Sequence, residues 1–208
     1  MRTPACLSLV VLLAAAATGC GGSHMTSSPP PTAQTTTAAP PATTTVSGPG
    51  ALQAEANSLA AGDIPDNQVF LVFRSAAAGF AMKYPEGWAE RRSGGSVTFR
   101  DKNNIVRVVV GPAAAPTLAS VHAEVSRLPH AAVQGLPAPM TLGGGKAFKV
   151  VYKTESAPNA VTGKRVTLMV DRYYLWKGGR LAVVDLGTPA GVDNVDAYRL
   201  MVESFRWR

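Results

Sequence analysis

The chain has 208 residues, a formal net charge of +7 at pH 7 and a sequence pI near 9.7. Both of its cysteines, Cys6 and Cys20, lie within the first twenty residues, which excludes a disulfide framework in the rest of the chain. The basic balance favours attraction to anionic headgroups or wall polymers, and solubility alone explains it equally well.

Residues 1–19 have the layout of a secretory signal peptide. Arg2 supplies the positive start, and Cys6–Ala17 is an uncharged apolar run, shorter than the roughly 18 to 20 residues that span a bilayer. The following Ala17–Cys20 resembles the lipobox of bacterial lipoproteins, which implies cleavage before Cys20 and acylation of its thiol by a diacylglyceryl (palmitate-type) group. The alternatives are a cysteine that happens to follow a cleavable signal, and an uncleaved anchor.

Residues 20–50 are expected to tether the protein to the outer face of the cytoplasmic membrane. Gly21–Ala54 contains no Lys, Arg, Asp or Glu, and Ser23–Gly50 is dominated by Thr, Pro, Ser and Ala, a composition typical of a disordered linker. Its Thr clusters suit O-linked sugars, and an unmodified spacer fits equally well. An exported protein rarely meets nucleic acid, so the basic charge does not predict a nucleic-acid partner.

Residues 51–208 are expected to form a single domain. Residues 51–61 favour a short leading helix, and 117–128 and 193–205 show helical spacing of apolar residues, with Thr117 and Asp193 as N-caps. Strands are predicted at 69–73 (buried), 80–84, 96–100, 105–110, 147–154, 166–176 and 181–186. The order of elements predicts an α+β domain, with a largely antiparallel sheet packed by helices.

Gly79–Trp88 (GFAMKYPEGW) is similar to the opening of PsbP-like domains, and Val97–Asp101 followed by Ile105–Val110 resembles their next hairpin. The resemblance covers Asp66–Arg208 and is to PsbP-like domain lipoproteins of actinobacterial type. It implies an α/β/α sandwich around an antiparallel sheet, in a family of non-enzymatic binding and assembly-factor domains.

Catalytic and metal-binding patterns are missing from the sequence, so we predict no enzyme, no metal site and no cofactor. His24 falls in the linker, and His122 and His130 have no nearby cysteine and only Glu124 between them, a poor ligand set. Asp171 and Asp185 could face each other as paired carboxylates; solvent exposure, or pairing with Arg172 or Arg180, is the simpler interpretation.

Aromatic residues beside arginines are the remaining candidates for contact with a ligand or partner. One concave face could hold Tyr84, Trp88, Tyr173, Tyr174 and Trp176, with Arg91 and Arg92 at its rim. Core packing of the aromatics and a solvated turn at Arg91-Arg92 are the simpler interpretations. Three functions follow: a module that binds or assembles an envelope protein, a carrier of a lipid or glycolipid in an apolar pocket, and, last, an envelope hydrolase.

Overall fold

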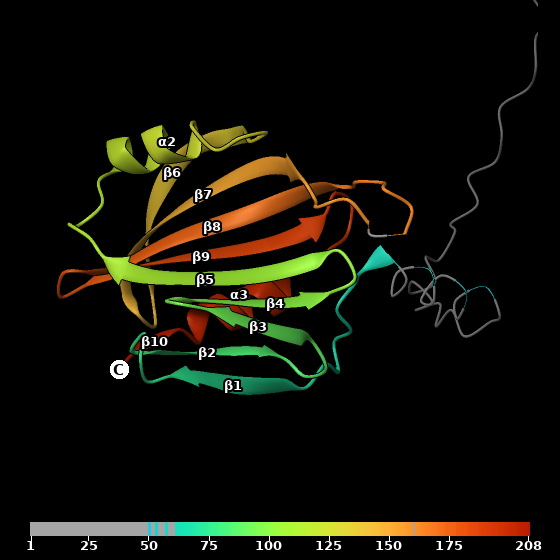
Figure 1. Ribbon diagram of the computed structural model, residues 1–208, viewed down its shortest axis with the longest axis horizontal. Coiled ribbons are helices and arrows are strands. Elements are labelled where there is room, and N and C mark those ends of the chain that lie inside the picture. The colour runs from blue at the N-terminus through green and yellow to red at the C-terminus, as the bar shows by residue number, and fades with distance from the viewer. Residues whose placement is uncertain (1–49, 51–52, 54–56, 58–60, 160) are drawn as a thin grey trace, which may run out of the picture. The chain divides into compact units, whose positions relative to one another are not determined.

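A seven-stranded antiparallel sheet forms the centre of the computed structural model, which describes residues 50, 53, 57, 61–159 and 161–208 (Figure 1). Its strand order is β3-β4-β5-β9-β8-β7-β6, so β3 and β6 are the edge strands. The strands are β3 (Ala89–Ser93), β4 (Ser96–Asp101), β5 (Asn104–Pro112), β6 (Ala132–Leu142), β7 (Gly145–Glu155), β8 (Thr167–Lys177) and β9 (Arg180–Pro189).

A smaller antiparallel sheet and two helices complete the elements with described bounds. The sheet has the order β1-β2-β10, from β1 (Phe70–Ser75), β2 (Phe80–Pro85) and β10 (Arg206–Trp207). The helices are α2 (Leu118–Val125) and α3 (Val195–Glu203). Figure 1 shows α2 beside β6 and β7, whereas α3 lies behind the seven-stranded sheet. No helix among the described residues is long and apolar enough to cross a membrane.

Two apolar clusters, one on each face of the seven-stranded sheet, hold these layers together. Alternation along β8 sends Tyr173 and Leu175 into the cluster that contains α3 and the small sheet, and Tyr174 into the cluster that contains α2. This central strand therefore carries apolar side chains on both faces, on either side of its polar pair Asp171-Arg172, because both of its faces are covered. A helix packed on each face of an antiparallel sheet confirms the predicted α+β class and its sandwich arrangement.

A buried polar network fixes the beginning of α3 against the sheet. The amide of Asn194 donates to the Gly62 carbonyl at 3.1 Å, to Thr188 Oγ1 at 2.8 Å and to Asn104 Oδ1 at 3.2 Å. Its Oδ1 accepts from the backbone N–H of Ile64 at 2.8 Å. One side chain thus joins the segment before β1 to β5, β9 and α3, which no local sequence pattern indicates.

Gly144, in the turn between β6 and β7, permits a close approach of that turn to the core. A Cβ at this position would lie 2.7 Å from Phe205 Cδ1 and 2.8 Å from Leu175 Cδ2, closer than such carbons pack. The glycine in this turn is therefore a packing requirement.

Most predicted elements are found, and the corrections concern burial, one N-cap and the unpredicted strands β3, β6 and β10. Residues 69–73 were expected to form a buried strand, but β1 is an edge strand that leaves Leu71 and Val72 exposed. Arg91 and Arg92 lie on strand β3 and not in a turn. Asn194, and not Asp193, occupies the N-cap position of α3. Of the expected leading helix, residues 53, 57 and 61 are helical, and 51–52, 54–56 and 58–60 lie outside the described residues.

The predicted N-cap of the middle helix is confirmed. The Thr117 hydroxyl accepts from the Ser120 backbone N–H at 3.1 Å, and the Ser120 hydroxyl accepts from the Thr117 N–H at 2.9 Å. This reciprocal capping box ends the extended segment 113–116 at a defined point. Val121 and Val125 then bury one face of α2 against the sheet.

Candidate functional site

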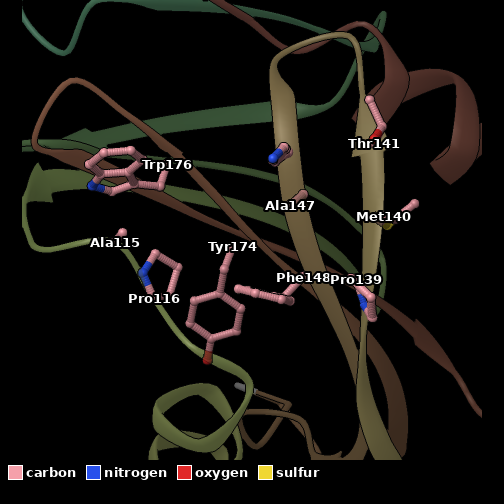
Figure 2. A pocket seen from close by; sticks show the side chains of 10 residues that line it. Ala115, Pro116, Pro139, Met140, Thr141, Ala147, Phe148, Tyr174 and Trp176 are labelled. Atoms are coloured by element: carbon pink, nitrogen blue, oxygen red, sulfur yellow. The ribbon is translucent and has the colours of Figure 1, made fainter.

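An apolar cleft of about 570 Å³ lies where β6, β7 and β8 meet the segment that enters α2 (Figure 2). Its lining is mainly apolar. Aromatic, proline and small side chains make up most of its wall. The lining residues are Ala115, Pro116, Pro139, Met140, Thr141, Lys146, Ala147, Phe148, Tyr174 and Trp176.

Tyr174 supplies the floor of this cleft and is only 1% exposed. Its hydroxyl is buried and has no hydrogen-bond partner among the described residues. Burial raises the pKa of Tyr174, so the phenol stays neutral and keeps its proton to donate. An unsatisfied buried hydroxyl costs free energy, and a bound acceptor or an ordered water would remove that cost.

Trp176 forms one wall and is held in place by a single polar contact. Its indole Nε1 donates to the Ala113 carbonyl at 3.1 Å, which joins the end of β8 to the segment before α2. The side chain is 38% exposed, although its neighbour Tyr174 on the same strand face is buried. The ring therefore presents apolar area to anything that enters the cleft.

Lys146 provides the positive charge of the cleft. It pairs in register with Thr141 across the β6–β7 hairpin, is exposed, and has no ion-pair partner within the described portion of the chain. A long apolar stem with a free ammonium group at its tip suits the border between an apolar cleft and water. The cleft thus combines an aromatic interior with one cationic group.

A buried ion pair lies farther along the same sheet face. Arg172 donates from Nε to Asp185 Oδ1 at 2.6 Å and from Nη2 to Asp185 Oδ2 at 2.9 Å, and its Nη1 lies 3.3 Å from Glu124 Oε1. Burial lowers the pKa of Arg172, but its pairing with Asp185 outweighs that effect, and the net shift is upward. The fork-to-carboxylate geometry joins β8 to β9, and the Glu124 contact attaches α2 to them beside the cleft.

The two aspartates considered as a carboxylate pair do not face each other. Asp185 pairs in register with Arg172, while Asp171 pairs with Leu186 and lies on the opposite face, with the Lys149 Nζ 2.6 Å from its Oδ2. The described residues contain no group of three or more His, Cys, Asp and Glu side chains placed to hold a metal ion.

The structure divides the predicted aromatic face. Tyr84 stacks on Phe99 with ring centroids 4.3 Å apart. Tyr84, the buried Trp88 and Tyr173 all belong to the apolar cluster on the α3 side of the sheet. Only Tyr174 and Trp176 line the cleft, on the α2 side. The physical reason is the alternation of side chains along β8, which places consecutive tyrosines on opposite faces.

The predicted rim arginines are also separated. Arg92 pairs with Glu90 and lies with its guanidinium carbon 4.8 Å from the Phe73 ring centroid. Arg91 points to the other side of β3, in register with Thr98. His122 and His130 are exposed, and their side chains form no hydrogen bond or ion pair with the described residues. The predicted lipidation site Cys20, like His24, lies outside the described residues.

Sequence analysis missed the β6 side of the cleft, which carries Pro139 and Thr141. Its prolines disguise a strand, because a proline cannot donate to a sheet and the segment reads as a loop. The prolines are compatible with pairing to β7 because β6 is an edge strand and its register shifts between Gln134 and Ala138. The glycine-rich turn at 143–145 could have indicated β6, because the strand that follows a hairpin turn pairs with a strand before it.

No protein-family model matches the chain, and no curated protein matches it. Solved structures do match. A Bacteroides thetaiotaomicron protein is 18% identical over 66% of this chain and 48% of its own, with a TM-score of 0.43, so the chain spans about half the length of that protein.

Two further solved structures are matched over nearly their whole length. The cyanobacterial PsbP protein (CyanoP) of Synechocystis sp. PCC 6803 is 16% identical over 71% of this chain and 98% of its own, with a TM-score of 0.47. The Ran-binding protein Mog1p of Saccharomyces cerevisiae is 9% identical over 68% and 96%, with a TM-score of 0.42. A PsbP protein is thus among the structures that the chain is similar to, and the likeness concerns the fold alone.

Proposed function

We propose that this protein is a lipid-anchored, extracytoplasmic binding module that acts without catalysis and binds an amphipathic lipid or glycolipid of the cell envelope. The observation that carries the proposal is the apolar cleft, whose aromatic lining is Phe148, Tyr174 and Trp176. A void of about 570 Å³ falls in the range of small-molecule sites. A flat apolar surface would have favoured a protein partner.

The chemistry of the lining matches a ligand with an apolar part and a polar or anionic part. An acyl chain or polyprenyl segment would pack against Phe148, Trp176 and the two prolines. The Lys146 ammonium group can pair with an anionic headgroup. A tether from acylated Cys20 would keep the cleft near the source of such ligands.

The proposal is tested by filling the cleft. The full chain carrying Cys20→Ser, which lacks the acylation site, is titrated with a fluorescent fatty acid. Ala115 is an exposed residue of the cleft wall and Ala114 is its exposed neighbour outside the cleft, so Ala115→Trp and Ala114→Trp form a matched pair. We expect saturable binding that Ala115→Trp weakens about tenfold or more and Ala114→Trp leaves unchanged. Equal affinities for the two variants would contradict the proposal.

A protein partner is the second candidate, and two exposed apolar side chains among charged ones, beside a sheet edge, favour it. Val72 of edge strand β1 and Leu200 of α3 line one shallow surface hollow, and both side chains are exposed. Unpaired backbone at a sheet edge beside apolar side chains suits contact with an envelope protein. Crosslinking from position 72, compared with position 102 in an exposed turn, distinguishes the two: capture of one protein from position 72 alone supports this candidate.

A further inference from the structure

Three arginines gather on the open part of the sheet face that α2 only half covers. α2 contacts β6 and β7, and Figure 1 shows it at the opposite edge of the sheet from β3. Arg91 of β3, Arg100 of β4 and Arg107 of β5 line a hollow of about 660 Å³ there, with Thr98 between them. This site is distinct from the apolar cleft at the β6 edge.

The strand register places these cations on one face. Arg91, Thr98 and Arg107 pair in a single row across three neighbouring strands, and Arg100 lies two residues from Thr98 on the same strand face. Strands are about 4.8 Å apart, so the outer two arginines of the row have backbones roughly 10 Å apart. Guanidinium groups at that separation can reach a common ligand placed over the threonine.

The neighbouring acids do not neutralise this charge. Asp185 pairs in register with Arg107, but both of its oxygens accept from Arg172. Glu90, at the margin of the hollow, pairs with Arg92. No acid in the described residues lies within ion-pair distance of the three arginines, all of which are exposed.

We propose that Arg91, Arg100 and Arg107, with the Thr98 hydroxyl, bind a phosphate group. Three unpaired like charges on one face repel one another, and a bound dianion or phosphodiester reverses that repulsion. The planar guanidinium fork matches phosphate oxygens bidentately, and the threonine hydroxyl adds a donor at the centre of the row. The proposal does not depend on what occupies the apolar cleft.

The test uses the full chain carrying Cys20→Ser, with two probes that distinguish the source of the phosphate. Inorganic phosphate is titrated by calorimetry, and vesicles of phosphatidylcholine with or without phosphatidylglycerol are assayed by co-sedimentation. R91Q/R107Q removes two cations from the site. R74Q/R127Q removes two exposed cations elsewhere and is matched in net charge.

We expect R91Q/R107Q to weaken binding of at least one probe about tenfold or more, while R74Q/R127Q stays within about twofold of the parent. If R91Q/R107Q loses binding of inorganic phosphate, the ligand is a free phosphate or phosphomonoester. If it loses binding of the vesicles alone, the ligand is a lipid headgroup. R91K/R107K keeps the charge and loses the planar guanidinium fork, so its affinity is expected to lie between those of the parent and R91Q/R107Q. Equal weakening by both charge-removing variants, or no binding of either probe by the parent chain, would overturn the proposal.

Discussion

Removing the carboxylate of Asp185 is expected to destabilise the protein far more than removing that of Glu124, although both contact Arg172. Asp185 is 9% exposed and accepts two hydrogen bonds from Arg172, which is itself 7% exposed. Breaking a buried pair on one side costs about 3 to 5 kcal/mol, because it leaves an uncompensated charge. We expect about 3 kcal/mol for Asp185→Ala, since the Glu124 carboxylate remains near Arg172.

Glu124 is the matched control because its side chain is 49% exposed, and exposed pairs contribute about 1 kcal/mol or less. Urea unfolding of the three proteins, followed by tryptophan fluorescence, gives the free energies, provided that the m-values agree. A third variant, R172M/D185L, replaces the pair with apolar side chains and is expected to lose less than Asp185→Ala alone. The reasoning is refuted if Asp185→Ala and Glu124→Ala destabilise equally.

Three further predictions concern the packing and the titration of the core. Asn194→Ala is expected to lower the free energy of unfolding by about 2 to 3 kcal/mol in urea melts, because it leaves several buried partners unsatisfied; a loss below about 0.5 kcal/mol would contradict the network. Gly144→Ala is expected to destabilise by about 1 to 3 kcal/mol through overpacking, whereas Gly111→Ala, with nothing within 4 Å of the added carbon, should stay within about 0.5 kcal/mol in the same assay. Burial raises the pKa of Tyr152 from 10.0 to about 12, so the stability that its proton contributes is complete below pH 10 and is lost as the pH rises through 12. This contribution, about 3 kcal/mol at most, should be absent from the profile of unfolding free energy against pH for Tyr152→Phe. Identical profiles for parent and variant would contradict it.

The sequence predicts those parts of the fold in which apolar residues recur with the period of a strand or a helix. The alternation along 166–176 and the threonine cap of α2 both correspond to what the structure shows. Burial of 69–73 was wrong because an apolar run does not reveal whether its strand lies at a sheet edge. The short strand β3 was missed because Glu90, Arg91 and Arg92 lack any apolar alternation.

The candidate site was only half accessible to sequence reasoning. Tyr174 and Trp176 were identified as candidates, but alternation alone cannot say which face of β8 is fully packed. The other walls come from Pro116 and Pro139, which the sequence indicates as breaks in regular structure. They lie 23 positions or more from each other and from Trp176. A cleft of this kind depends on the tertiary gap between α2 and the β6–β7 hairpin, which no local pattern encodes.

The most direct test of the proposed function is native mass spectrometry of the full-length protein, purified from its own membranes and released from detergent in the gas phase. If the protein binds an amphipathic lipid, its mass should exceed that of the acylated chain by one discrete adduct, which disappears on denaturation and is absent from Ala115→Trp. A protein that carries only its covalent acyl groups, with identical masses for the parent and that variant, would contradict the proposal.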